Sequence, residues 1–277
     1  MAEKIPAEKR RDRSRSMTIT RRDLLLAATA SVGTATLAAC GGSPDSGAPA
    51  SGPPGAPPPG TPPAGAPSPP VRPVPPPIPP PTFVYSTNFD LTEFPISEGG
   101  KWFNTGQLWT NVRTANGLAF GTNGARDTND DSYAYLSGFA PDQQAEAVVH
   151  VDPNLIGTPH QVEMLLRWAD SAQNARGYEC LFDHQGGVQI VRWGGPFGDL
   201  TDVPGTGFRT LGRNLVSGDI LKANVIGNTI TLYINGLPIY QAIDSTWTTG
   251  QPGIAFFKRA AGLNTDFAIT SFTASSF

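Results

Sequence analysis

Four charged residues on two neighbouring β-rich runs, residues 161–168 and 178–183, are the best candidates for chemistry. Successive side chains of a strand point to opposite faces, so Met164, Leu166 and Trp168 predict the buried face of the first run. The charged residues expected together on the outer face are Glu163, Arg167, Glu179 and Asp183. Two of these carboxylates about 5 to 9 Å apart would suit glycoside hydrolysis. The same residues would otherwise bind a sugar without catalysis, or form a solvated face of cross-strand Glu–Arg pairs.

Aromatic side chains beside Gly-rich or polar loops are a second possible sugar contact. Trp193, in "VRWGGPFGDL", is the preferred stacking platform, although large aromatic residues of small domains are usually packed in the core. The register of the hairpin at residues 183–188 decides what lies beside Glu179. One register places Arg192 there, and a slip of one residue places Trp193 there instead. The predicted sugar-binding residues are therefore Trp193, Arg167, Glu179 and Arg192.

The segment "ARDTNDDS", residues 125–132, gathers hard oxygen ligands of the kind that calcium prefers. Asp127, Asn129 and Asp131 are the candidate ligands. The spacing is not that of an EF-hand loop, so an acidic turn without a metal is the competing interpretation. No other cofactor is indicated, because the three histidines are scattered without metal-ligand spacing. A single cysteine, Cys180, lies in the β-rich part and is expected to be a buried, unreactive side chain.

Short β-rich runs separated by turn residues dominate the sequence after residue 82. The stretch "ILKANVIGNTITLYINGLPIYQAID" predicts strands at 220–226, 229–234 and 237–243, because Gly-Asn and Asn-Gly pairs favour tight hairpin turns. Further strands are expected at 145–151, 161–168, 178–183, 188–193, 253–257 and 267–274. No window shows a helical stripe. The pattern predicts an all-β, antiparallel two-sheet sandwich of the jelly-roll kind.

Several of these stretches resemble the concanavalin A-like lectin and glucanase superfamily, especially its laminin-G-like and 3-keto-disaccharide hydrolase-like sandwiches. They are "STNFD", "LLRWADSAQNARGYECLFDHQGGVQIVRW", "VIGNTITLYINGLPIYQAIDS" and "DFAITSF". The resemblance covers nearly all of residues 83–277 and implies glycan handling on the concave outer face. It also implies a structural calcium near the first and last strands, where Asp90 and Asp266 match loosely.

The fold alone does not determine chemistry. The leading prediction is a domain that binds glycan or a cell-surface polymer without catalysis. The alternatives are a glycoside hydrolase or polysaccharide lyase acting through Glu163, Glu179 or Asp183, and a purely structural or adhesive protein. No G-x-S-x-G, H-E-x-x-H or phosphate-loop motif occurs. Residues 83–277 carry 18 acidic and 11 basic residues, which argues against a nucleic-acid partner.

The N-terminal residues read as an export signal. In "TRRDLLLAATASVGTATLAAC", Arg21 and Arg22 precede an apolar run at residues 24–39. This run is shorter than the roughly 20 apolar residues that a membrane-spanning helix needs. The pair resembles a twin-arginine motif, and the residues before Cys40 resemble a bacterial lipobox, in which the cysteine is lipidated. Residues 1–39 are therefore predicted to be a signal peptide, with a start at Met17 as an option.

A proline-rich segment follows the predicted lipidation site. Residues 41–82 consist almost entirely of Pro, Gly, Ala and Ser, a composition that cannot bury enough apolar surface to fold. We expect residues 40–82 to be a lipidated tether, with a proline-rich ligand for a partner as the alternative. Together these features predict a lipoprotein anchored to the cell envelope by its lipid, with the sandwich at residues 83–277.

Overall fold

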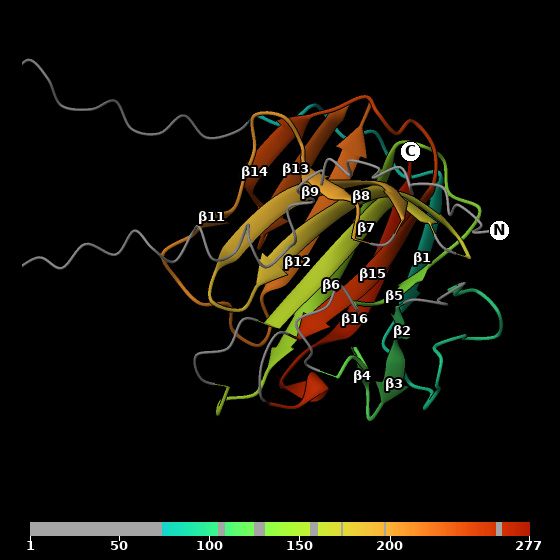
Figure 1. The fold of residues 1–277 in the computed structure, drawn as a ribbon, viewed down its shortest axis with the longest axis vertical. Coiled ribbons are helices and arrows are strands. Elements are labelled where there is room, and N and C mark those ends of the chain that lie inside the picture. Colours follow the sequence, from blue (N-terminus) through green and yellow to red (C-terminus); the bar gives the residue numbers. More distant parts are fainter. Residues whose placement is uncertain are drawn as a thin grey trace, which may run out of the picture.

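The computed structural model describes residues 74–104, 109–124, 131–155, 160–172, 174–196, 198–258 and 262–277. Within these residues the chain forms two β-sheets (Figure 1). One sheet, sheet A, contains β1 (Phe83–Thr87), β3 (Arg113–Ala115), β4 (Leu118–Phe120), β6 (Gln143–Val151), β12 (Ile220–Ile226), β13 (Thr229–Ile234), β14 (Leu237–Ile243) and β16 (Phe267–Ser276). The other, sheet B, contains β2 (Thr110–Asn111), β5 (Ser132–Tyr135), β7 (His160–Ser171), β8 (Asn174–Asp183), β9 (Gly187–Pro196), β10 (Leu200–Asp202), β11 (Arg209–Thr210) and β15 (Gln251–Lys258). A short 3-10 helix, η1 (Asn264–Asp266), precedes β16.

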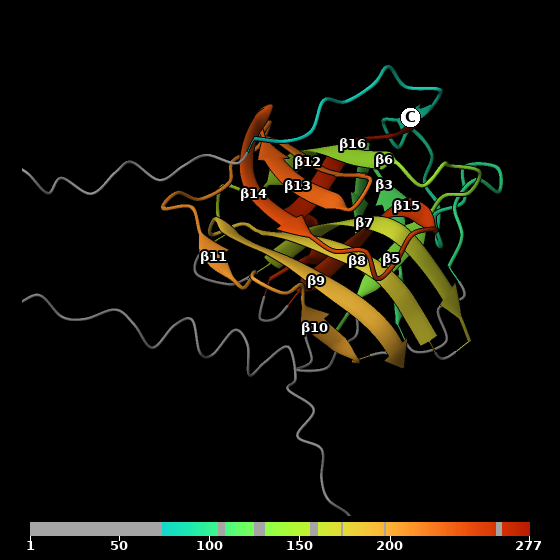
Figure 2. The ribbon, with the colours of Figure 1, turned by 90° about the horizontal axis from the view of Figure 1, so that it is seen from above.

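The two sheets are stacked face to face, as the view from above shows (Figure 2). Sheet A has the order β14-β13-β12-β6-β16-β4-β3, with β1 also paired to β16. Sheet B has the order β10-β9-β8-β7-β15-β5-β2, with β11 also paired to β9. All of these pairs are antiparallel except β2 with β5. The predicted fold class, an all-β, antiparallel two-sheet sandwich of the jelly-roll kind, is confirmed.

The main hydrophobic core lies between the sheets. Alternate residues of the strands enter it, as expected from the two-residue period of a strand. Met164, Cys180 and Phe182 contribute from sheet B, and Ile230 and Leu232 from sheet A. Complete burial of a side chain of this size contributes roughly 1.5–3 kcal/mol. Cys180 is a free thiol, and its predicted burial is confirmed; burial also raises the pKa of the thiol.

The strands predicted from the C-terminal half agree with the structure. β12, β13 and β14 have the predicted bounds. Asn235 and Gly236 both have positive φ, at 51° and 77°, which is the conformation that an Asn-Gly hairpin turn requires. The other six predicted strands correspond to β6, β7, β8, β9, β15 and β16, each extended at one or both ends.

A bulge in β7 rearranges the residues that follow it. The register between β7 and β8 shifts between Leu166 and Ala169, and Arg167 has a positive φ of 48°. Two glycines make room for this backbone: a Cβ on Gly177 would lie 2.8 Å from Cα of Trp168, and one on Gly250 would lie 2.1 Å from the carbonyl carbon of Arg167. The bulge reverses the expected orientations of Arg167 and Trp168. Trp168 therefore belongs to a second hydrophobic cluster, on the outer face of sheet B.

Candidate functional site

Three carboxylates meet on the outer face of sheet B. Glu163 of β7 and Glu179 of β8 lie on this face as predicted, and Asp131, just before β5, joins them. One ligand oxygen from each lies within 4.8 Å of the others. The exposed fractions are 0% for Asp131 and Glu163 and 1% for Glu179. Such a group has the chemistry to hold a hard cation or to pair two carboxylates for acid–base work.

A second hydrophobic cluster surrounds these carboxylates. Its largest members are Trp109, Trp168 and Trp193, whose rings lie 4.6 to 6.2 Å apart between centroids. The indole Nε1–H of Trp193 donates a hydrogen bond to Oε2 of Glu179 at 2.9 Å. Trp193 is fully buried, so the prediction that it is an exposed stacking platform is wrong. Its ring packs against the other tryptophans and its polar edge supports a carboxylate.

The register of β8 and β9 settles the choice between Arg192 and Trp193. Glu179 is opposite Val191, and Gly177 is opposite Trp193, so Trp193 shares the face of Glu179 and Arg192 points to the other face. Arg192 donates a hydrogen bond from Nη1 to Oδ2 of Asp244 at 2.9 Å. Of the two registers that the sequence leaves open, the structure has the one with Trp193 on the face of Glu179, so the candidate sugar contact Arg192 does not lie beside Glu179.

Arg167 also leaves the predicted face, because the bulge turns it toward the interior. Its guanidinium donates to the carbonyl oxygens of Pro141, Trp247 and Gly227 and to Oδ1 of Asp142, at 2.7 to 3.2 Å. Burial lowers its pKa, and the nearby Asp142 opposes that effect. Arg167 therefore ties three segments together instead of lining the outer face as predicted.

Asp183 remains on the outer face but is not part of the carboxylate group. It lies opposite Gln161 at the far end of β8, and its Oδ1 accepts the backbone N–H of Gln185. The adjacent His184 is buried near His160, and burial, followed by the field of His160, lowers the pKa of His184 to about 4. Asp183 therefore stabilises a turn beside the buried side chains of His160 and His184.

The predicted calcium ligands have different positions. Asp131 belongs to the carboxylate group, whereas Asp127 and Asn129 lie outside the described residues. Asp90 is exposed, and Asp266 accepts the backbone N–H of Leu263 at the start of η1. Neither Asp90 nor Asp266 belongs to a metal-competent group among the described residues. Among the described residues, the carboxylates that could hold a cation are thus Asp131, Glu163 and Glu179.

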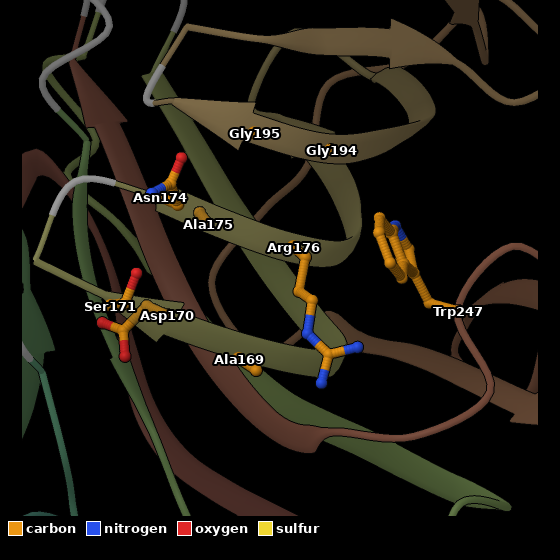
Figure 3. Close-up of a pocket in the computed structure, with 9 residues that line it drawn as sticks. All are labelled: Ala169, Asp170, Ser171, Asn174, Ala175, Arg176, Gly194, Gly195 and Trp247. Carbon is orange, nitrogen blue, oxygen red and sulfur yellow. The ribbon is translucent and has the colours of Figure 1, made fainter.

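An open pocket of about 380 Å³ lies at one end of sheet B (Figure 3). It is formed by the β7–β8 hairpin, the end of β9 and the loop that leads into β15. The lining residues are Ala169, Asp170, Ser171, Asn174, Ala175, Arg176, Gly194, Gly195 and Trp247. Its volume falls at the small end of the range for ligand pockets, about 300–1,000 Å³.

Hydrogen bonds fix Trp247 as one wall of this pocket. Its indole Nε1–H donates to the carbonyl oxygen of Trp193 at 2.8 Å, and its backbone N–H donates to Oη of Tyr178 at 3.0 Å. Burial raises the pKa of Tyr178 to about 12, which keeps this hydroxyl protonated, and it donates to Asp244. Hydrogen bonds from Tyr178 and Thr246 keep the pKa of Asp244 low despite its burial. The indole is therefore held rigidly while part of it stays accessible.

The side chains along the hairpin divide between the two faces of sheet B. Arg176 is paired with Ala169 and Gly194, and its guanidinium lies over the ring of Trp247, 5.5 Å from the centroid. The carboxylate of Asp170 lies on the opposite face, where it accepts hydrogen bonds from Tyr133 and from Tyr135. Figure 3 shows the guanidinium turned toward Trp247 and the Asp170 carboxylate away from it.

Most residues of this pocket were not predicted from the sequence. Ser171, Asn174 and Arg176 belong to the polar stretch "DSAQNARG" between two predicted strands, and Gly194 belongs to "WGG" on the next strand. A polar hairpin beside a Gly-Gly pair is the one signal that could have identified it. That signal does not reveal which side chains share a face, because the bulge at Arg167 changes the alternation.

The predicted export and lipidation residues, Arg21, Arg22 and Cys40, lie outside the described residues. So does the predicted tether before residue 74. Among the residues that are described, no helix has the length and apolar character needed to cross a membrane.

No protein-family model matches the chain, and no curated protein matches it in sequence. Solved structures with a similar arrangement of strands exist. The carbohydrate-binding module CBM66 from Bacillus subtilis is 14% identical, with a TM-score of 0.40 over 65% of this chain and 95% of that chain. The β-glucanase of Bacillus licheniformis is 12% identical, with a TM-score of 0.43 over 70% and 98%.

The carbohydrate recognition domain of Emp46p, in a potassium-bound form, is 13% identical, with a TM-score of 0.46 over 68% of this chain and 93% of that chain. At these sequence identities and TM-scores, the three structures resemble this chain only in the arrangement of their strands. No functional residue of theirs can be assigned to this chain on that basis. Membership of the concanavalin A-like superfamily stays a prediction.

Proposed function

We propose that this protein binds a carbohydrate, without catalysis, in the pocket between the β7–β8 hairpin and Trp247. The observation that carries the proposal is the partly accessible indole of Trp247, held by hydrogen bonds at the wall of an open pocket. A sugar ring presents an apolar C–H face, which packs against an aromatic ring, and hydroxyl groups at its edge.

The other lining groups suit those hydroxyl groups. Ser171 and Asn174 pair with each other at the end of the hairpin and supply a hydroxyl and an amide, which both donate and accept hydrogen bonds. Gly194 has no side chain, and a Cβ built on it would meet no atom within 4 Å. An apolar wall with a few convergent polar groups is the usual composition of a small-ligand site.

A glycan array probed with the full-length chain tests this proposal. Trp247→Ala is expected to lower the signal of every bound glycan at least about tenfold, the loss typical of a central aromatic contact. Phe94→Ala, which truncates another exposed aromatic side chain, is the matched control and is expected to bind normally. If no glycan bound, or if Trp247→Ala bound like the wild type, the proposal would be wrong and a structural or adhesive role would remain.

A second candidate function is glycoside hydrolysis or polysaccharide cleavage, favoured by the close approach of the Glu163 and Glu179 carboxylates. Retaining hydrolases place their two carboxyl groups about 5–5.5 Å apart. Both residues are buried, which is why binding without catalysis is the first proposal.

Release of reducing sugar or of unsaturated product from a polysaccharide panel tests this second candidate. Activity that is abolished by Glu163→Gln or Glu179→Gln, and retained by Glu146→Gln on sheet A, would support an enzyme. Absence of product from the whole panel would exclude it for those polysaccharides.

We also propose that the binding domain is displayed at the cell envelope by a lipid on Cys40, as the sequence predicts. Metabolic labelling with a fatty acid in a bacterial host tests this. The label is expected to disappear in Cys40→Ser and to persist in Cys180→Ser, the other cysteine of the chain. Label retained in Cys40→Ser would contradict the anchor.

A further inference from the structure

We infer that the carbohydrate bound in this pocket carries a carboxylate, as a uronate residue does, and that Arg176 binds that group. This inference rests on the proposed function and adds a ligand class to it. Arg167, Arg192 and Arg213 each form an ion pair with an aspartate, at 3.2, 2.9 and 2.8 Å.

Arg176 has no such partner among the described residues. Its guanidinium lies over the indole of Trp247 instead, and the side chain is exposed. A cation–π contact leaves the N–H donors at the edge of the guanidinium plane available for other bonds. The pocket therefore presents a positive charge whose hydrogen-bond donors face solvent.

The nearest carboxylate of the pocket lining does not neutralise this charge. Asp170 contributes to the lining, but its carboxylate lies on the other face of sheet B and accepts hydrogen bonds from Tyr133 and Tyr135. Asp199 approaches Gly195, not Gly194: a Cβ on Gly195 would lie 2.7 Å from Oδ2 of Asp199, whereas a Cβ on Gly194 would meet open space. Since successive residues of β9 point to opposite faces, Asp199 also lies across the sheet from Arg176.

The surroundings of Arg176 leave space for a bound anion. Its cross-strand neighbours are Ala169 on one side and Gly194 on the other, the smallest side chains that a strand can offer. The contact with Trp247 restricts the guanidinium plane. A planar fork of donors with a fixed orientation matches a carboxylate through two parallel hydrogen bonds.

The same pocket supplies contacts for the rest of the sugar. Ser171 and Asn174 are paired with each other, and this pair lies on the same face as the Ala169–Arg176 pair, two residues further along each strand. A ligand that spans from Arg176 toward the hairpin end would place its carboxylate at the guanidinium and its hydroxyls at Ser171 and Asn174. A uronate has both kinds of group on one ring.

Matched pairs of oligosaccharides test the inference with the full-length chain. The probes are oligogalacturonate, oligomannuronate and oligoglucuronate, each beside its carboxyl-reduced neutral form, with affinity measured by titration calorimetry. At least one uronate is expected to bind about tenfold or more tightly than its reduced form, the scale of a charge-assisted bidentate contact. Arg176→Gln is expected to remove that preference, and Arg176→Lys to restore part of it.

Arg209→Gln is the matched control, because Arg209 likewise lies over an aromatic ring, that of Tyr240, at 4.6 Å. It is expected to keep the preference for the uronate. Equal binding of a uronate and its reduced form, or binding of neutral or sulfate-ester glycans only, would overturn the carboxylate inference and leave sugar binding intact. If none of the uronates, none of their reduced forms and none of the glycans on the array bound, the proposed function itself would be wrong.

Discussion

Two regions of sheet B combine tryptophan with charged side chains, and they differ in access. On the outer face, Trp109, Trp168 and Trp193 pack around Asp131, Glu163 and Glu179, all of them buried. At the hairpin end, Trp247 and Arg176 line an open pocket. The regions are in contact, since Trp247 donates its indole hydrogen bond to the backbone of Trp193.

Burial, and not residue type, distinguishes the roles of the tryptophans in these two regions. A fully buried tryptophan contributes its area to stability and its N–H to one fixed acceptor, whereas a partly accessible one also has apolar surface that a ligand can contact. Substitutions in the first region should therefore change the free energy of unfolding, and substitutions in the second should change binding.

Trp193→Ala is expected to have the largest effect on stability. Truncating a fully buried tryptophan typically costs about 3–5 kcal/mol, and this change also removes the hydrogen bond to Glu179. Urea unfolding followed by circular dichroism would measure the loss. Trp247→Ala should cost much less, because its ring is only partly buried. Equal decreases in the free energy of unfolding of the two variants would contradict the proposed difference between the two regions.

Arg167→Ala is expected to destabilise the protein by about 3 kcal/mol, because it leaves buried carbonyl acceptors and Asp142 without their donor. One of those acceptors is the carbonyl of Trp247, so glycan affinity should fall as well. Arg209→Ala, at an exposed arginine that loses only its cation–π contact with Tyr240, is the control and should lower the free energy of unfolding by no more than about 1 kcal/mol. A stable Arg167→Ala variant would show that the bulge does not depend on this side chain.

Acid is expected to destabilise the fold through His184. Its folded pKa is about 4, below the usual value near 6.5, so the unfolded chain binds more protons between these values. Stability is therefore full above about pH 6.5 and falls as the pH drops toward 4, by up to about 3 kcal/mol.

The low pKa is caused by burial of the imidazole and then by the field of His160. A proton on Nδ1 of His184 would also displace the backbone N–H of His160, which Nδ1 accepts at 3.4 Å. Unfolding measured at pH 7 and pH 4.5 for wild type and His184→Asn should show a smaller acid loss in the variant. An identical loss in both proteins would assign the pH dependence to other groups.

Gly194→Leu is expected to have the smallest effect on stability, within about 0.5 kcal/mol, because the added side chain enters open space in a strand. It should nevertheless fill the pocket beside Arg176. Thermal unfolding would verify the stability. A strongly destabilised variant would show that the pocket is less open than the structure indicates.

The sheet framework could be predicted from the sequence because two-residue alternation and Asn-Gly turns are local signals. This is why β12, β13 and β14 matched their predicted bounds and why Glu163 and Glu179 lie on one face. The orientation of Arg167 and Trp168 could not be predicted. It depends on a bulge that Gly177 and Gly250 accommodate from other parts of the chain.

The candidate site was less predictable than the framework for the same reason. The choice between Arg192 and Trp193 required the register of β8 and β9, which the short apolar runs do not specify. The pocket joins a hairpin, a strand end and a distant loop, so no short stretch of sequence contains it.

The most direct measurement is the affinity of the best-binding oligosaccharide from the array for three full-length proteins: wild type, Gly194→Leu and Gly207→Leu. Gly207 is the control, because a Cβ there also meets no atom within 4 Å and it does not line the pocket. We expect Gly194→Leu to bind at least about tenfold more weakly and Gly207→Leu to bind like the wild type. Unchanged affinity in Gly194→Leu would contradict the assignment of the binding site to this pocket.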